Sequence, residues 1–205
     1  MIAIIDYGVG NIYSLISSLH RTGAEVCFTG DPDEIARADR MVLPGVGAFG
    51  DAAESLRKTG LDKVVRKEAL SGKPLLGICL GMQLLLEKSY EYGEHEGLGL
   101  IKGTIDPIEP LVPKGYKIPH IGWNALHFPK DKPKSPLFKD VPENSCVYFV
   151  HSYYANAKPE SVLATTEYGA ELTAAVSNGN VYGVQFHPEK SGEIGQRILK
   201  AFLEL

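Results

Sequence analysis

The chain has 205 residues, of which 44% are hydrophobic and 22% are charged, and its formal net charge at pH 7 is -4. This composition is typical of a globular protein with one good-sized core, and the small negative charge gives no electrostatic case for binding nucleic acid or an acidic membrane surface. The N-terminal segment 1–6 lacks the basic region of a signal peptide, and no apolar stretch approaches the length of a membrane span.

The first half of the chain alternates between short apolar runs and amphipathic segments. Strands are predicted at 2–5, 25–28, 40–43 and 74–78, and helices at 12–21, from 31 onward, and within 51–70. This β-α-β rhythm predicts a parallel sheet with helices on both faces. Ligands of such sheets bind beyond the carboxyl ends of the strands.

Two glycine-containing loops follow strands of this predicted sheet. The loop 6–11 contains Gly8-x-Gly10 but lacks the third glycine that a dinucleotide-binding fingerprint requires. The loop 44–50 reads Pro-Gly-Val-Gly-Ala-Phe-Gly. It is either a tight turn between strand and helix or a row of exposed amide groups able to receive a developing oxyanion.

The second half of the chain changes character, with prolines concentrated between residues 107 and 142. Strands are predicted at 99–105, 122–127, 146–150, 162–166, 172–177 and 181–186, which indicates a largely antiparallel extension of the parallel core. Asn178-Gly179 is predicted as a two-residue hairpin turn, and an amphipathic helix is predicted at 193–203. We expect one domain over residues 1–205.

A cysteine interrupts the apolar run 74–86 in the pattern Gly77-x-Cys79-x-Gly81. The same pattern with serine forms a nucleophile elbow, in which a buried strand turns sharply into a helix and glycines avoid a collision across the turn. The positive end of the helix favours a nucleophilic thiolate there. The alternative is a buried structural cysteine at a strand end.

The other cysteines, Cys27 and Cys146, are distant in sequence, and there is no Cys-x-x-Cys pair. An odd number of cysteines at this spacing argues against a disulfide framework and against a zinc site, and it favours a reducing compartment. We therefore expect a cytoplasmic protein without metal or cofactor.

A cysteine nucleophile needs a base, and that base needs an orienting group. His187 ends the predicted strand 181–186 and is followed by Pro188 and Glu189. If the backbone stays extended, Glu189 projects to the same side as His187 and can fix its tautomer. The alternative is a loop with a surface carboxylate. Four of the remaining histidines are interpreted as structural or solvated: His20, His95, His120 and His127. The role of His151 is left open.

The blocks 77–83 and 183–189 together resemble the signatures of the class I, triad-type glutamine amidotransferases. The blocks 6–11, 44–49, 119–124, 148–154 and 190–192 are similar to one branch of that family, the glutaminase subunits of imidazole glycerol phosphate synthases. The resemblance covers nearly the whole chain. It implies a three-layer, flavodoxin-like α/β fold with a mostly parallel central sheet and an antiparallel C-terminal extension.

The resemblance also implies an activity, the hydrolysis of L-glutamine to L-glutamate and ammonia through a cysteine thioester. The implied catalytic residues are Cys79, His187 and Glu189. The implied oxyanion-hole residues are Leu80, Val46 and Gly47, and those implied to hold glutamine are Gly47, Gln83, Glu91, Ser152 and Tyr153.

Nothing in the sequence resembles an acceptor-substrate domain, so the ammonia has to be used elsewhere. The resemblance implies a heterodimer with a (βα)8-barrel cyclase that makes imidazole glycerol phosphate and an aminoimidazole carboxamide ribonucleotide in histidine biosynthesis. Asn11, Trp123 and Lys190 match positions at the face that meets this partner. We expect weak activity in the isolated chain and stimulation when the cyclase and its nucleotide ligand bind, through an amide of 45–47 turning into the oxyanion hole.

Three other functions compete with this interpretation. Another glutaminase of the same class could serve pyridoxal phosphate, anthranilate or aminodeoxychorismate synthesis, but the Gly122-Trp123-Asn124 block and the block 6–11 argue against it. A γ-glutamyl hydrolase would work without a partner. A flavodoxin-like binding module would leave Cys79 inert.

Overall fold

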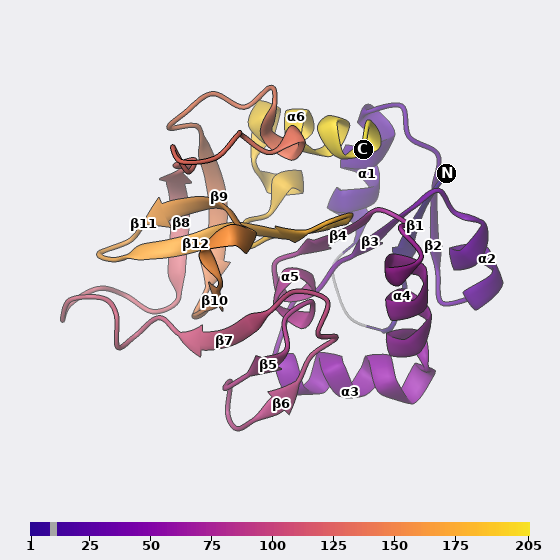
Figure 1. Ribbon diagram of the computed structural model, residues 1–205, viewed down its shortest axis with the longest axis horizontal. Helices are drawn as coiled ribbons and strands as arrows, with labels where there is room; N and C mark the ends of the chain where they lie inside the picture. The colour runs from indigo at the N-terminus through magenta and orange to yellow at the C-terminus, as the bar shows by residue number, and fades with distance from the viewer. Residues whose placement is uncertain (9–11) are drawn as a thin grey trace.

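The computed structural model describes residues 1–8 and 12–205. Within them, a seven-stranded sheet has the order β11-β12-β13-β4-β3-β1-β2 (Figure 1). The five parallel strands are β2 (Val26–Thr29), β1 (Ile2–Ile5), β3 (Arg40–Leu43), β4 (Leu75–Ile78) and β13 (Val181–Val184). The last two, β12 (Glu171–Asn178) and β11 (Val162–Glu167), are antiparallel. The predicted mostly parallel sheet with an antiparallel extension is therefore confirmed.

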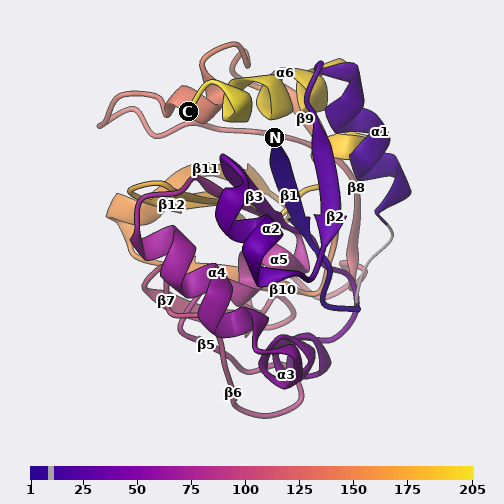
Figure 2. The same ribbon diagram turned by 90° about the vertical axis from the view of Figure 1, so that its right-hand side faces the viewer.

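Helices cover both faces of this sheet, and Figure 2 shows them in two separate layers. One layer holds α1 (Tyr13–Arg21) and α6 (Gly192–Leu203), and the other holds α2 (Pro32–Arg37), α3 (Phe49–Thr59) and α4 (Leu61–Leu70). Alternate residues of each strand supply the two cores: Ile2 and Ile4 belong to the first, and Ala3 and Ile5 to the second. Burial on both faces explains why the central strands β1 and β4 are apolar throughout.

The helix ends follow local sequence chemistry. Asp31 caps α2 by accepting a hydrogen bond of 2.8 Å from the amide of Asp33, and Pro32 lies in the first turn of this helix, which was predicted from residue 31 onward. The predicted helical segment 51–70 is two helices, because Gly60 takes a left-handed conformation with φ of 75° and ends α3. Glycine adopts that conformation without the steric penalty of a Cβ atom.

Two smaller sheets complete the second half. One is the four-stranded sheet β10 (Tyr153–Ala157), β7 (Gly103–Pro107), β5 (Lys88–Ser89) and β6 (His95–Glu96), and the other pairs β8 (His120–Ala125) with β9 (Cys146–His151). The sequence did not predict β5, β6 and β10, and it began the strand 99–105 too early. The hairpin turn is one residue off: Asn178 pairs with Val181, so the turn is Gly179-Asn180.

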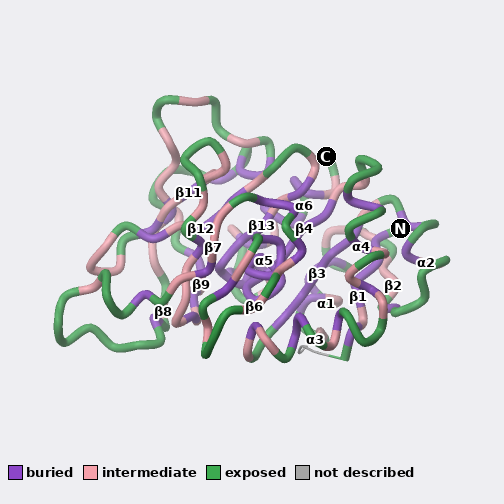
Figure 3. Tube along the Cα trace, turned by 60° about the horizontal axis from the view of Figure 1, so that its bottom comes forward, coloured by how far each residue is buried: buried purple, intermediate pink, exposed green. Residues whose placement is uncertain are grey.

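The described part of the chain also contains the short helix α5 (Leu80–Leu84) and three 3-10 helices, at Pro136–Phe138, Pro159–Ser161 and Pro188–Lys190. Figure 3 shows burial concentrated on the central strands and exposure on the peripheral loops. Among the described residues, no helix has the length and apolarity needed to cross a membrane. Since β1, β3, β4 and β13 run parallel, the segments that follow their carboxyl ends meet at one edge of the sheet.

Candidate active site

Cys79 stands at that edge, between β4 and α5, in a strained conformation. Its φ of 53° and ψ of -112° lie where L-residues are rarely found. The flanking glycines make the turn possible: a Cβ atom at Gly81 would lie 1.8 Å from the carbonyl oxygen of Leu43, and one at Gly77 would lie 2.7 Å from the carbonyl oxygen of Gly81. The sharp turn predicted from the Gly-x-Cys-x-Gly pattern is present.

His187 lies at the same edge, just beyond β13, with its side chain buried. Its Nδ1 is 2.7 Å from Oε1 of Glu189. The backbone differs from the prediction, because residues 188–190 form a 3-10 turn and not an extended segment. The carboxylate still reaches the ring. Ser191 Oγ donates to the carbonyl of His187 at 2.6 Å and so helps hold this turn.

The electrostatics of His187 favour its charged form. Burial lowers its pKa, but the charge of the neighbouring Cys79 together with the hydrogen bond to Glu189 and the charge of Glu189 outweighs burial and raises the pKa to about 9. Among the described residues, its Nε2 is buried without a hydrogen-bond partner. The ring therefore has one nitrogen committed to the carboxylate and one free for proton transfer.

The sulfur of Cys79 has two neighbours that the sequence analysis did not name. Its thiol donates weakly to the carbonyl of Val150 at 3.9 Å, and Gln185 Nε2 donates to the sulfur at 3.7 Å. Gln185 is fully buried, and its Oε1 accepts from Gln83 Nε2 at 3.0 Å. Period-two spacing could have identified Gln185, which is two residues before His187.

A pocket of about 310 Å³ opens over this cysteine. It brings together the residues expected at the oxyanion hole and around glutamine: Val46, Gly47, Leu80, Gln83, Glu91, Ser152 and Tyr153, with Cys79 and His187. Pro119, Val150 and His151 also line it. The residues predicted for the oxyanion hole and for glutamine binding, scattered along the chain, thus share one cavity with Cys79 and His187.

Glu91 lines the pocket and also contacts the start of α3, which follows the loop after β3. Its carboxylate accepts a hydrogen bond from the amide of Phe49, the first residue of α3. A carboxylate is well placed there because the first amides of a helix lack intrahelical acceptors. Part of the hydrogen-bonding capacity of Glu91 is therefore used inside the protein.

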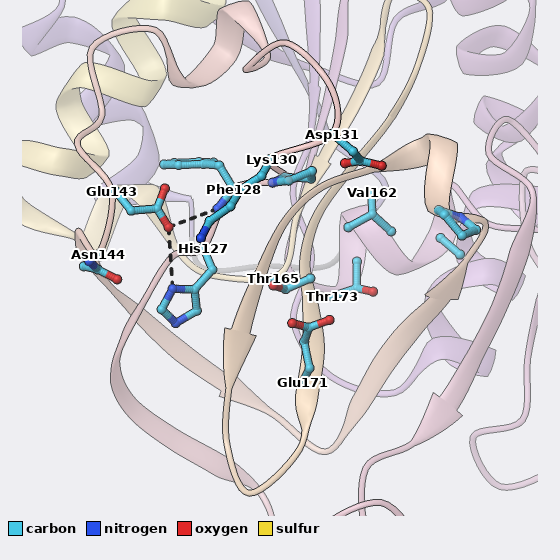
Figure 4. A pocket seen from close by; sticks show the side chains of 13 residues that line it. His127, Phe128, Lys130, Asp131, Glu143, Asn144, Val162, Thr165, Glu171 and Thr173 are labelled. Atoms are coloured by element: carbon cyan, nitrogen blue, oxygen red, sulfur yellow. Dashed lines mark hydrogen bonds and ion pairs between the residues drawn. The ribbon is translucent and has the colours of Figure 1, made fainter.

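A second hollow, larger at about 680 Å³, lies between the loop after β8 and the antiparallel strands (Figure 4). His127 Nδ1 lies 3.6 Å from a Glu143 carboxylate oxygen, which also accepts from the amide of Phe128. The residues lining this hollow include no cysteine, and His127 is partly exposed. Reactive groups converge in the smaller pocket and not here.

Two residues expected at a partner interface share one surface. Trp123 is 56% exposed and lies edge-on to Tyr148, with 6.1 Å between ring centroids. Lys190 places its ammonium 5.8 Å from the same Tyr148 ring. An exposed tryptophan beside a cation over an aromatic ring is typical of a binding surface. Asn11, the third expected residue, lies outside the described residues.

Among the described residues, no group of three histidine, cysteine, aspartate or glutamate side chains is arranged to hold a metal ion. The three cysteines are free thiols.

Comparison with known proteins gives concordant results. The family described as glutamine amidotransferase class-I matches residues 3–205. The chain is 49% identical to the imidazole glycerol phosphate synthase subunit HisH of Wolinella succinogenes, with 100% of both chains covered. It is 50% identical to the HisH subunit of Oceanobacillus iheyensis, covering 100% of this chain and 99% of the relative.

Solved structures resemble the fold at lower sequence identity. PurLQS from Thermotoga maritima matches with a TM-score of 0.77 at 23% identity, over 99% of this chain and 97% of the other. The glutaminase domain of Trypanosoma brucei CTPS matches with a TM-score of 0.67 at 16% identity, over 99% and 93% of the two chains. These similarities confirm the expected fold class.

Proposed function

Because the chain belongs to the class I glutamine amidotransferase family, we propose that it is the glutaminase subunit of an imidazole glycerol phosphate synthase. It hydrolyses L-glutamine to L-glutamate and ammonia for histidine biosynthesis, as one amidotransferase domain. One observation carries the proposed chemistry: the buried His187–Glu189 pair, with 2.7 Å between its atoms, shares a pocket with a cysteine held at a strained turn.

In the first half of the proposed reaction, the Cys79 thiolate attacks the side-chain carbonyl carbon of glutamine. The tetrahedral intermediate collapses to a glutamyl thioester when the carbon–nitrogen bond breaks. His187 delivers a proton from Nε2, so that the nitrogen leaves as ammonia. Glu189 holds the other ring nitrogen and stabilises the imidazolium that precedes this transfer.

In the second half, water attacks the thioester carbon while His187 accepts its proton. The second tetrahedral intermediate then expels the Cys79 thiolate and releases glutamate. Both intermediates carry an oxyanion beside the sulfur. Leu80, at the first position of α5, and Val46 or Gly47 in the neighbouring loop are proposed to donate their amides to it.

Glutamine has charged groups at one end, so its pocket needs polar partners. We assign this role to Gly47, Gln83, Glu91, Ser152 and Tyr153, whose presence in one pocket with Cys79 supports the assignment. The carboxylate of Glu91 suits the ammonium group of the substrate, and backbone amides of the Ser152–Tyr153 segment suit its carboxylate.

The relatives are named as subunits of a synthase, which supports a working partner for this chain. We propose that this partner is the (βα)8-barrel cyclase, which consumes the ammonia. Trp123 and Lys190 form the described part of the proposed interface, and their shared surface over Tyr148 supports it. Asn11 is proposed to join them.

The loop 44–48 is suited to a regulated oxyanion hole. Val46 is 44% exposed at the edge of the pocket, and Gly47 has a φ of 101° with open space around its Cβ position. An exposed segment containing glycine can change its peptide orientation at low steric cost. We propose that binding of the cyclase and its nucleotide ligand turns an amide of 45–47 toward the sulfur and so raises a weak basal activity.

Full-length identity of 49% and 50% to HisH subunits favours this function over glutaminases of other pathways and over a γ-glutamyl hydrolase. An inert flavodoxin-like module conflicts with the strained cysteine and the buried His187–Glu189 pair. Among the described residues, no observation favours a glutaminase of another pathway, a γ-glutamyl hydrolase or an inert binding module.

The test is ammonia release from glutamine, measured with and without a bacterial cyclase and its nucleotide ligand. We expect low turnover alone, strong stimulation by the complex, and no turnover by Cys79→Ala. Equal turnover in both conditions refutes the proposed activation. Absence of turnover and of Cys79 labelling by a glutamine-analogue electrophile, even with the cyclase, refutes the glutaminase itself.

A further inference from the structure

The loop 44–48, which carries proposed oxyanion donors, is tightly held at its first end and exposed in its middle. Tyr7 Oη donates to the carbonyl of Pro44 at 2.7 Å, and both residues are buried. A Cβ atom at Gly45 would lie 2.7 Å from the same hydroxyl, so the chain is closely packed here. The next two residues are exposed. The position of their amides therefore depends on how the second end of the loop is held.

The second end is the start of α3, which is capped from a distant part of the chain. Ala48, the residue before the helix, has only a methyl side chain and cannot cap it. The amide of Phe49, the first residue of α3, donates to Oε2 of Glu91 at 2.5 Å. That carboxylate lies 42 residues further along the chain. It provides the acceptor that Asp31 provides locally for α2.

The hairpin of β5 and β6 holds Glu91 at this helix end. The amide of Glu91 donates to Ser89 Oγ at 3.1 Å, and Ser89 is fully buried on β5. On β6, the His95 ring packs against Gly50 of α3, where a Cβ atom would lie 2.8 Å from the ring. Figure 1 shows β6 beside α3. The contact from Glu91 to the helix is therefore part of a packed interface.

The same carboxylate lines the pocket over Cys79. The hydrogen bond from Phe49 uses Oε2, which leaves Oε1 for the ammonium group of glutamine. A carboxylate can accept several hydrogen bonds at once, so both contacts can form together. Glu91 therefore joins the substrate pocket to the helix end that directly follows the loop 44–48.

We propose that Glu91 is a positioning residue for the oxyanion hole, in addition to its role in holding glutamine. By accepting from the Phe49 amide, it fixes the end of the loop 44–48 and so sets where the exposed amides of the loop stand relative to the reactive sulfur. An oxyanion hole needs donors that are in place before the charge develops, so a loosened loop end slows the step that forms the oxyanion. This inference rests on the proposed glutaminase function and gives one of its residues a second role.

Two substitutions of Glu91 separate this role from binding of the ammonium group. Glu91→Gln loses the negative charge, so it should bind glutamine more weakly, but it keeps a side-chain oxygen that can accept from the Phe49 amide. Glu91→Ala loses both the charge and the acceptor. Glu94→Gln and Glu94→Ala are matched controls, because Glu94 lies on the same hairpin, is exposed, and pairs with Lys88 Nζ at 2.6 Å.

The assay measures alkylation of Cys79 by two electrophiles, with the cyclase and its nucleotide ligand present. The first is a chloroketone analogue of glutamine without the amino group, which needs the oxyanion hole but not the ammonium site. The second is iodoacetamide, which reacts by displacement without forming an oxyanion. We expect the saturating chloroketone rate to fall about tenfold in Glu91→Ala and less than about threefold in Glu91→Gln, with similar iodoacetamide rates in both. The Glu94 variants should match the native chain.

Hydrogen exchange measures the contact at the loop end directly. The Phe49 amide should exchange slowly in the native chain and in Glu91→Gln, and about tenfold faster or more in Glu91→Ala. The amides of β4 report whether the core stays folded, and their exchange should be the same in all three chains. If Glu91→Ala speeds exchange in β4 as much as at Phe49, Glu91 acts on global stability and the proposal is overturned.

Equal chloroketone rates in Glu91→Gln and Glu91→Ala, or equal exchange of their Phe49 amides, also overturn the proposal. Ammonia release from glutamine by the native chain with the cyclase is measured alongside. Its absence refutes the proposed function, and this inference with it. Native ammonia release together with equal chloroketone rates in the two Glu91 variants overturns this inference alone.

Discussion

Replacing Glu189 with glutamine should remove much of the electrostatic support of His187. The pKa of His187 is raised from 6.5 to about 9 by Cys79 and Glu189 against the opposing effect of burial. A shift of this size corresponds to about 3 kcal/mol in favour of the imidazolium in the folded state. In Glu189→Gln burial remains while the carboxylate charge is lost, so the pKa of His187 should fall by at least about one unit.

The sign of the stability effect follows from the direction of the shift. A pKa raised on folding stabilises the native state fully below 6.5, and that stabilisation is lost as the pH rises through about 9. Glu189→Gln should therefore be less stable than the native chain at pH 6, by up to about 3 kcal/mol, or roughly 5–10 °C in melting temperature. The difference should shrink as the pH approaches 10.

Two measurements check this prediction. NMR titration of labelled histidine should give a pKa of about 9 for His187 in the native chain and a lower pKa in the variant. In the variant, kcat/KM for glutamine should fall by a factor of about 10² or more. Glu193→Gln is the matched control, since Glu193 is exposed and pairs with Arg197 at 2.6 Å. A native His187 that titrates near 6.5, or at the same pH in the variant, would refute the electrostatic reasoning.

Three further substitutions have definite expectations. Gly81→Ala places a Cβ atom 1.8 Å from the Leu43 carbonyl oxygen, so we expect destabilisation by about 3 kcal/mol or more in thermal unfolding; a native melting temperature would contradict it. Gln185→Leu removes the donor to sulfur and the acceptor for Gln83, and should lower the rate of Cys79 labelling about tenfold with unchanged circular dichroism. Trp123→Ala should leave the melting temperature within about 2 °C because the ring is 56% exposed, yet weaken cyclase binding by 2 kcal/mol or more, on the order of thirtyfold, in calorimetric titration.

Much of the fold and the candidate nucleophile could be predicted from the sequence because the determining interactions are local. The alternation of apolar runs with amphipathic segments predicted β1 to β4 and the helices around them, since both faces of a parallel sheet are covered. The glycines on either side of Cys79 predicted a sharp turn, since only residues without a Cβ atom fit where α5 approaches β3.

Other features depended on contacts between distant segments and could not be read locally. The sequence missed β10, which only Ser152 separates from β9, because β10 is defined by its pairing with the distant strand β7. Likewise, the distance from His187 to Glu189 depended on a 3-10 turn that the Pro188 pattern alone did not predict.

The sequence by itself determined which groups are capable of nucleophilic catalysis: a thiol at a glycine-flanked turn, and an imidazole with a carboxylate two residues away. Only the tertiary structure decided which polar groups support them. Gln185 looked like part of a strand, yet pairing of β13 with β4 places its side chain against the Cys79 sulfur. That outcome depends on strand register and burial, which bring together residues far apart in sequence.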